Sequence, residues 1–68
     1  MNKEERYRQF EEDCGEAGIM TEEYHGRNYY IGPSVECDDF DEVQEVIRAT
    51  SILLQWDSLG RGYVVYPK

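Results

Sequence analysis

The carboxyl-terminal third of the chain alternates between apolar and polar positions in the manner of a β-hairpin. Residues 52–57 place apolar side chains, Trp56 among them, at every second position, which is the period of a strand with one buried face. Residues 63–66 form a second run, of tyrosine and valine, and both residue types favour strands. The loop between the runs contains two glycines, which supply the positive φ angles that hairpin turns require. The pattern predicts a hairpin over residues 49–67 at the centre of the fold, with Trp56 in the core.

The first eighteen residues have instead the period of an amphipathic helix, which is predicted over residues 2–18. Asn2 is a suitable cap, and Glu5 stands three residues later, where its side chain can reach the N–H of the cap. Gly18 favours termination because glycine adopts the left-handed region without strain. Apolar side chains at spacings of three and four form one narrow stripe: Tyr7, Phe10, Cys14 and Ala17. We expect this helix to lie on one side of the sheet or against a second protein.

A second helix is predicted over residues 38–50, and its end signals are the clearest in the chain. Asp39 is the expected cap, with Glu42 completing a capping box. Acids crowd the start of this helix and Arg48 lies near its end, which is the arrangement that the helix dipole favours. Apolar side chains recur along one face: Phe40, Val43 and Ile47.

The stretch between the two helices predicts short strands. Residues 20–24 and 28–31 are rich in tyrosine and are joined by a bend at Gly26. Pro33 has no N–H to donate, so we expect it to break the second strand, with a short strand resuming at residues 34–37. The chain is therefore expected to form one α+β domain over residues 1–68. Its order is α-β-β-(β)-α-β-β, with two helices on a mainly antiparallel sheet of three to five strands.

Composition narrows the classes of function. Sixty-eight residues leave little room for a deep catalytic cleft beside a core. The chain carries fifteen acids against seven Lys and Arg, and fourteen of those acids lie within residues 1–45. Such a surface repels phosphates, so direct binding of nucleic acid is disfavoured. The charge fits either a merely solubilising surface or an acidic face directed at a basic partner protein.

The two cysteines, Cys14 and Cys37, fit neither a disulfide framework nor a zinc pattern, since the chain has a single histidine. We expect both thiols to be free and buried. No apolar segment approaches the roughly 20 residues of a membrane span, and the amino terminus has no apolar signal core. The expected location is the cytoplasm.

Candidate catalytic groups are weak. The acids around residues 38–45 have no apolar surroundings that would shift their pKa values, so acid–base catalysis is not expected from them. Their carboxylates could hold a divalent cation, although the spacing is not that of an EF-hand loop. His25 and Cys37 could act as a base and nucleophile only if the fold brought them together. We expect no enzymatic activity and no cofactor.

The acidic faces of the two predicted helices are the principal candidate binding surface. Carboxylates one helical turn apart lie about 5–6 Å apart at Cβ, a spacing of the same order as that of successive backbone phosphates. Tyrosines near such a surface can anchor a partner, because they bury area and keep a polar tip. Tyr66 is a further candidate for exposure. The expected partner-binding residues are Glu5, Glu12, Glu16, Asp38, Asp39, Asp41, Glu42, Glu45, Tyr24 and Tyr29.

From Tyr24 onward the chain resembles a small family of uncharacterised proteins from cyanobacteria and their phages. The motifs that carry the resemblance are Tyr24-His25-Gly26-Arg27, Gly32-Pro33 followed by Val35, Val46-Ile47-Arg48-Ala49-Thr50-Ser51, Leu54-Gln55-Trp56-Asp57 and Tyr63-Val64-Val65-Tyr66-Pro67. The resemblance omits the first helix and implies no activity. It implies a short accessory or phage-borne protein, and anti-CRISPR inhibitors are proteins of similar size and charge.

The preferred hypothesis is a non-enzymatic protein-binding domain, an acidic inhibitor that docks on a basic, nucleic-acid-handling complex by mimicking nucleic acid. One alternative is a homo-oligomeric accessory domain whose first helix completes the core of a neighbouring copy. A second alternative is a small enzyme or sensor that depends on a divalent metal.

Overall fold

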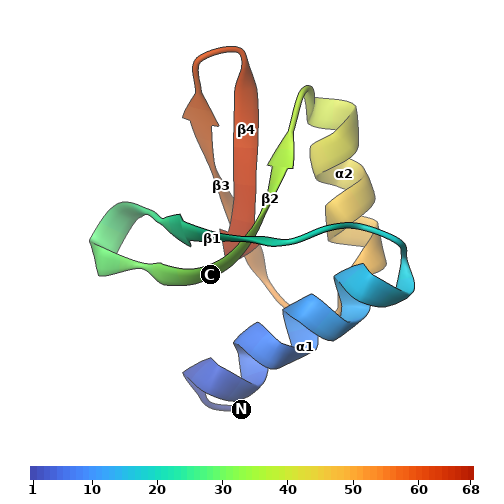
Figure 1. Cartoon of the computed structure of the whole chain (residues 1–68), viewed down its shortest axis with the longest axis vertical. Helices are drawn as coiled ribbons and strands as arrows, with labels where there is room; N and C mark the ends of the chain where they lie inside the picture. Colours follow the sequence, from blue (N-terminus) through green and yellow to red (C-terminus); the bar gives the residue numbers. More distant parts are fainter.

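The computed structural model describes residues 1–68 and contains two helices and four strands (Figure 1). Their order is α1 (Lys3–Glu16), β1 (Glu22–His25), a 3₁₀ turn η1 (Arg27–Tyr29), β2 (Ile31–Cys37), α2 (Phe40–Ala49), β3 (Leu54–Leu59) and β4 (Gly62–Pro67). The strands form one sheet in the order β1-β2-β4-β3, and all neighbouring strands are antiparallel. The expected α+β class and the expected hairpin of β3 and β4 are confirmed.

Both helices begin at the caps that the sequence predicts. The Asn2 side chain accepts a hydrogen bond from the Glu5 N–H at 2.9 Å, and Asp39 accepts one from the Glu42 N–H at 3.0 Å. The Glu42 carboxylate in turn accepts from the N–H of Asp38, at 2.9 Å, rather than from that of Asp39. The start of α2 is therefore fixed by two reciprocal side-chain contacts, which satisfy backbone donors that have no partner within the helix.

The end of α1 turns the chain back onto the core. Gly18 has a φ of 74°, and the N–H of Ile19 donates to the Cys14 carbonyl at 2.8 Å. This is the left-handed helix ending that glycine makes easy. Ile19 then packs against the main core.

The main core lies between the sheet and the two helices. Its buried members come from α1, β2, α2 and β4 and are Phe10, Cys14, Val35, Cys37, Val43, Val46 and Val65. Complete burial of such a side chain is worth about 1.5–3 kcal/mol, so these residues supply most of the stability of a chain this short. Phe10 and Cys14 are fully buried. The chain's own sheet and α2 therefore cover the apolar stripe of α1.

A second, tyrosine-rich core lies on the other face of β4. Tyr30, Val64 and Tyr66 are buried there, with Tyr7 and Tyr24 packed against them. The ring centroids of Tyr30 and Tyr66 are 4.5 Å apart. In Figure 1 the chain crosses in front of the lower ends of β3 and β4 as it enters β1, which is how the β1–β2 hairpin covers this face. Tyr66, a candidate for exposure from the sequence, is completely buried.

Trp56 was expected in the core, but 38% of its surface is exposed, so this prediction is wrong. It lies on β3, which is the outermost strand of the sheet. Its ring packs against Phe40 at the start of α2, with 5.5 Å between the ring centroids. A residue on an outer strand has neighbours on one side only, so even a large aromatic ring there stays partly in solvent.

The middle of the chain differs from the expected short strands. Residues 27–29 form a 3₁₀ turn, in which Asn28 and Tyr29 have φ angles of 56° and 60°, so the expected strand over residues 28–31 is wrong. Pro33 does not interrupt β2 either. It pairs with Glu23 on β1, whereas β4 pairs only with residues 35–37 on the other side of β2. Proline is tolerated at this position because one side of the strand requires no donor there.

Candidate functional site

The acids of α1 that the sequence nominates lie on its solvent side. Glu5, Glu12 and Glu16 are all exposed. The helix meets the carboxyl end of α2, where the Asp13 carboxylate accepts hydrogen bonds from the Ser51 N–H at 3.0 Å and the Ser51 hydroxyl at 3.1 Å. Figure 1 shows the start of α2 at the far end of that helix from α1. The acids of α1 and those at the start of α2 therefore do not form the single surface expected from the sequence.

The acids at the start of α2 are exposed as predicted, but several have a local role. Asp38, Asp39 and Asp41 face solvent, while Asp39 and Glu42 hold the cap described above. Glu45 is exposed one turn further along α2. Negative charge at this position also interacts favourably with the helix dipole, so part of this acidity stabilises the helix itself.

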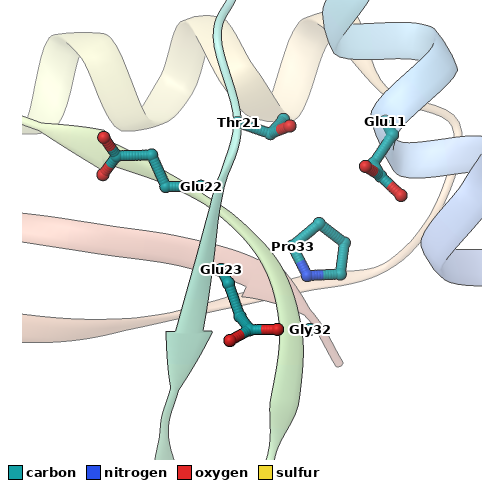
Figure 2. A pocket seen from close by; sticks show the side chains of 6 residues that line it. All are labelled: Glu11, Thr21, Glu22, Glu23, Gly32 and Pro33. Atoms are coloured by element: carbon teal, nitrogen blue, oxygen red, sulfur yellow. The ribbon is translucent and has the colours of Figure 1, made fainter.

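A pocket between α1 and the edge of the sheet is lined by three glutamates that are absent from the predicted binding surface. Glu11 from α1 and Glu22 and Glu23 from β1 line it, together with Thr21, Gly32 and Pro33. Figure 2 shows the Glu11 carboxylate directed toward Pro33, the Glu23 side chain directed toward Gly32, and the Glu22 side chain directed away from both. Successive residues of a strand point to opposite sides, so β1 carries carboxylates on both.

The Glu22 side chain instead meets a fourth glutamate, Glu36 of β2. A hydrogen bond with the Glu22 carboxyl, together with the repulsion between the two charges, raises the pKa of Glu36. Both side chains are exposed, so water weakens this repulsion but does not remove it. Two like charges on neighbouring strands are unfavourable for folding.

On the far side of β1, Glu36 lines a second depression with Glu42 and Glu45 of α2. The floor of this depression is apolar, and Ile19 and Met20 form its wall. Glu36 therefore links the pocket of Figure 2 to α2. We call this set the acidic belt, and its members are Glu11, Glu22, Glu23, Glu36, Glu42 and Glu45.

Very little of the acidic belt is neutralised within the chain. Only two ion pairs form in the whole structure. One joins Glu23 to His25, with 3.5 Å between the nitrogen and the carboxylate oxygen, and it exists only when the histidine is protonated. The other joins Arg27 to Asp57 at 2.6 Å and lies outside the belt. The belt therefore presents its negative charge to solvent.

Asp57 is the centre of a separate polar cluster on the tyrosine-rich face. Its carboxylate accepts hydrogen bonds from the Tyr24 hydroxyl at 2.8 Å, the Tyr66 hydroxyl at 2.9 Å and the Arg27 guanidinium at 2.6 Å. Partial burial acts to raise the pKa of Asp57, but the three donors outweigh it and lower that pKa. For Tyr24, burial and the adjacent carboxylate raise the pKa to about 12. These groups hold the β1–β2 hairpin against β3.

The two tyrosines nominated as anchors have different environments. The Tyr24 hydroxyl is bound to Asp57, and its ring packs at a tilt of 55° against Tyr66, with 5.2 Å between ring centroids. A partner would have to break these contacts to use Tyr24. Tyr29 is 99% exposed and lies at the tip of the β1–β2 hairpin. Figure 1 places that tip on the opposite side of the molecule from α2. Tyr29 is available to a partner but is not adjacent to the acids of α2.

The structure gives no support to a catalytic cysteine. Burial raises the pKa of the Cys37 thiol to about 11, and its side chain lies in the main core, whereas His25 is exposed on β1. Cys14 is likewise buried and free, as the sequence predicts. No group of three or more His, Cys, Asp or Glu side chains converges in a way that could hold a metal ion. Neither helix has the length and apolar character needed to cross a membrane.

Four belt residues, Glu11, Glu22, Glu23 and Glu36, are absent from the sequence-based selection. The acids predicted to bind a partner all lie on or beside the predicted helices, whereas Glu22, Glu23 and Glu36 lie on strands. One signal in the sequence could have identified Glu36. In the alternation of residues 34–37, Glu36 points outward when Val35 and Cys37 point inward. The pairing of β1 with β2 was also needed, because only this pairing brings Glu22 close to Glu36.

Comparisons of the chain with protein-family models, with curated proteins and with solved structures find no match. The candidate site is accordingly defined by the chain's own geometry.

Proposed function

We propose that this chain is a non-enzymatic protein-binding domain whose acidic belt docks on a basic surface of a partner protein. Electrostatic attraction of this kind raises the rate of encounter and selects the partner. The class of partner that fits is a protein whose Lys and Arg residues otherwise contact nucleic-acid phosphates. The chain would then act as an inhibitor by occupying that basic surface.

The pairing of β1 with β2 is the observation that carries this proposal, because Glu22 lies opposite Ser34, two positions from Glu36, and the nearness of the two carboxyls raises the pKa of Glu36. The chain supplies Asp57 with an arginine and two tyrosine hydroxyls, but it leaves Glu22 and Glu36 facing each other without a basic neighbour. Such a pair costs stability in the free protein. Its cost is relieved when a Lys or Arg of a partner lies between the two carboxylates, so binding and relief of repulsion are coupled.

The resemblance of residues 24–67 to a family from cyanobacteria and their phages supports the inhibitor version of this proposal by analogy. The belt is also suited to mimic the phosphates of nucleic acid. Carboxylates one helical turn apart, such as those of Glu42 and Glu45, have Cβ atoms about 5–6 Å apart, which is of the same order as the spacing of successive phosphates. A mimic of this kind competes with nucleic acid for one basic channel.

The test compares proteins retained from a cell lysate by the immobilised chain and by two variants of equal charge. One variant carries Glu22→Gln and Glu36→Gln, and the control carries Glu5→Gln and Glu12→Gln on α1. We expect proteins with basic surfaces to be retained by the wild type and the control and lost by the belt variant. Retention should also fall steeply between about 50 and 300 mM salt, because exposed charges are screened over about 10 Å at 0.1 M. Equal retention by all three forms, or retention that ignores salt, would overturn the proposal.

A homo-oligomeric role is a second candidate, and the outer strand β3 favours it. Unlike the short and acidic β1 at the other edge, β3 carries partly exposed apolar side chains, with Leu59 49% exposed and the preceding Leu53 77% exposed. An open edge with exposed apolar residues is a template for pairing with another strand. Sedimentation at micromolar concentration separates the candidates, since a clean monomer counts against an oligomer.

A further inference from the structure

The depression beside α2 differs from the rest of the acidic belt because its floor is apolar. The chain runs from α1 into β1 through Ile19 and Met20, and these residues face α2 across the end of β2. Val46 of α2 forms part of the floor and is itself almost completely buried. Met20 is 84% exposed, so its flexible thioether side chain stands at the wall of the groove without a fixed partner.

The rim of the same groove is negatively charged. Glu42 and Glu45 come from α2, three residues apart and therefore on one face of the helix, and Glu36 comes from β2. The Glu42 carboxylate is held in place by the N–H of Asp38 at 2.9 Å through one oxygen, which leaves its other oxygen available. No lysine or arginine of the chain pairs with these three carboxylates.

We propose that this groove binds a short protein segment in which one apolar side chain is flanked by lysine or arginine residues. The inference rests on the proposed function and specifies the element of the partner that is recognised. The apolar side chain contacts Met20, Ile19 and the floor, while the flanking cations meet the carboxylates of the rim. Methionine suits this role because its unbranched, polarisable side chain adapts to differently shaped partners.

Charge complementarity selects this occupant over a second copy of the chain. Each copy has a formal net charge of −8, so two copies repel one another overall. A second copy would therefore add acids to an acidic rim. In a segment with basic residues on both sides of an apolar side chain, the basic residues pair with the carboxylates of the rim and the apolar side chain contacts the floor.

The probes for the test are two synthetic peptides labelled with fluorescein. One has the sequence Gly-Lys-Arg-Leu-Arg-Lys-Gly, and in the other serine replaces leucine, so the charge is unchanged. Fluorescence anisotropy at about 50 mM salt measures the affinity of each. We expect the leucine peptide to bind roughly tenfold more tightly, which is the effect of burying most of one leucine side chain.

Two pairs of variants place the binding in this groove. Met20→Ser is expected to abolish the preference for leucine. Leu53→Ser changes a similarly exposed apolar residue, just before β3 and outside the groove, and is expected to leave the preference unchanged. Glu45→Gln is expected to weaken both peptides more than Glu12→Gln on α1 does. All four residues are exposed, so these variants should fold normally.

Equal affinity for the two peptides, binding of neither peptide, or an equal effect of Met20→Ser and Leu53→Ser would overturn the inference. These outcomes differ from failure of the proposed function. If the groove fails while proteins are still lost by the Glu22→Gln and Glu36→Gln variant, docking on the belt stands without an apolar anchor. If the leucine preference holds while that variant retains every protein, the groove stands and the belt proposal fails.

Discussion

The Tyr24 hydroxyl on β1 donates a hydrogen bond to the Asp57 carboxylate on β3 at 2.8 Å, although the two residues are 33 positions apart. The two strands are the opposite edges of the sheet. The contact is possible because the β1–β2 hairpin packs over β4, with Tyr24 and Tyr30 against Tyr66. In Figure 1, β1 crosses in front of β4. The Asp57 carboxylate therefore joins the two edges of the sheet.

The substitution Asp57→Asn is expected to destabilise the protein. The side chain of Asp57 is only 11% exposed, and the neutral amide would lose the ion pair with Arg27 and offer the tyrosine hydroxyls one acceptor oxygen in place of two. Removing a partly buried charged acceptor of this kind costs about 2 kcal/mol. Urea denaturation of the variant and the wild type at pH 7 measures the difference. The nearby substitution Ser58→Ala, at an exposed residue of β3, is the control and should have little effect.

The same cluster predicts how stability depends on pH. The pKa of Asp57 is lowered in the folded protein, so the folded state binds its proton less readily than the unfolded chain does. Its contribution is complete above the ordinary aspartate pKa of about 4 and is lost as the pH falls from there through the lowered value. The stability difference between the wild type and Asp57→Asn should accordingly shrink between about pH 5 and pH 2. A difference that stays constant over this range would contradict the ion-pair assignment.

Glu36 predicts the opposite dependence on pH. Its pKa is raised by Glu22, so the folded state binds its proton more readily than the unfolded chain, and stability falls as the pH rises through the raised pKa. The variant Glu36→Gln removes the repulsion and should be more stable than the wild type at pH 7, with the gain vanishing below the ordinary glutamate pKa. Thermal unfolding at pH 7 and at about pH 3 checks this. Glu12→Gln, at an exposed acid on α1, is the control and should show no comparable gain.

Local signals in the sequence predict the helices well. The caps Asn2 and Asp39 and the ending at Gly18 each depend on atoms within a few residues, so the pattern of side chains along the chain contains the necessary information. The β3–β4 hairpin is predicted for the same reason, since a two-residue turn joins strands that pair directly.

Features that depend on the path of the whole chain are not predicted in the same way. Trp56 lies on the outer strand β3 and packs against Phe40 on the side of α2, whereas Tyr66 lies on the inner strand β4 beneath the β1–β2 hairpin, so only Tyr66 is buried. The belt contact between Glu22 and Glu36 requires β1 to pair with β2. The alternation of side chains along a strand does not determine the order or the pairing of the strands, because sheets with different strand orders can have the same alternation.

Two glycines should respond in opposite directions to replacement by alanine. A Cβ at Gly62 would lie 2.5 Å from the carbonyl oxygen of Cys37, a backbone atom that can move only if β2 shifts. Gly62→Ala should therefore cost about 2 kcal/mol. A Cβ at Gly15 meets nothing within 4 Å, and Gly15 lies inside α1, so Gly15→Ala should stabilise the protein by about 0.5–1 kcal/mol. Urea denaturation of both variants checks the pair, and equal changes would contradict the packing of β2 against β4.

The two cysteines provide a measure of how tightly the main core is packed. Burial raises the pKa of both the Cys14 and Cys37 thiols to about 11, and neither side chain has more than 3% of its surface exposed. Because the thiolate is the reactive form, alkylation by iodoacetamide at pH 8 should be far slower in the native protein than in urea.

The alkylation rate of the native protein should rise with small additions of urea only as the core opens. It should rise together for both cysteines because they share one cluster. Mass spectrometry of partly alkylated protein resolves the two sites. Rapid labelling of Cys37 alone would mean that the groove floor opens independently of the core, contrary to the packing of Val46 and Cys37 in one cluster.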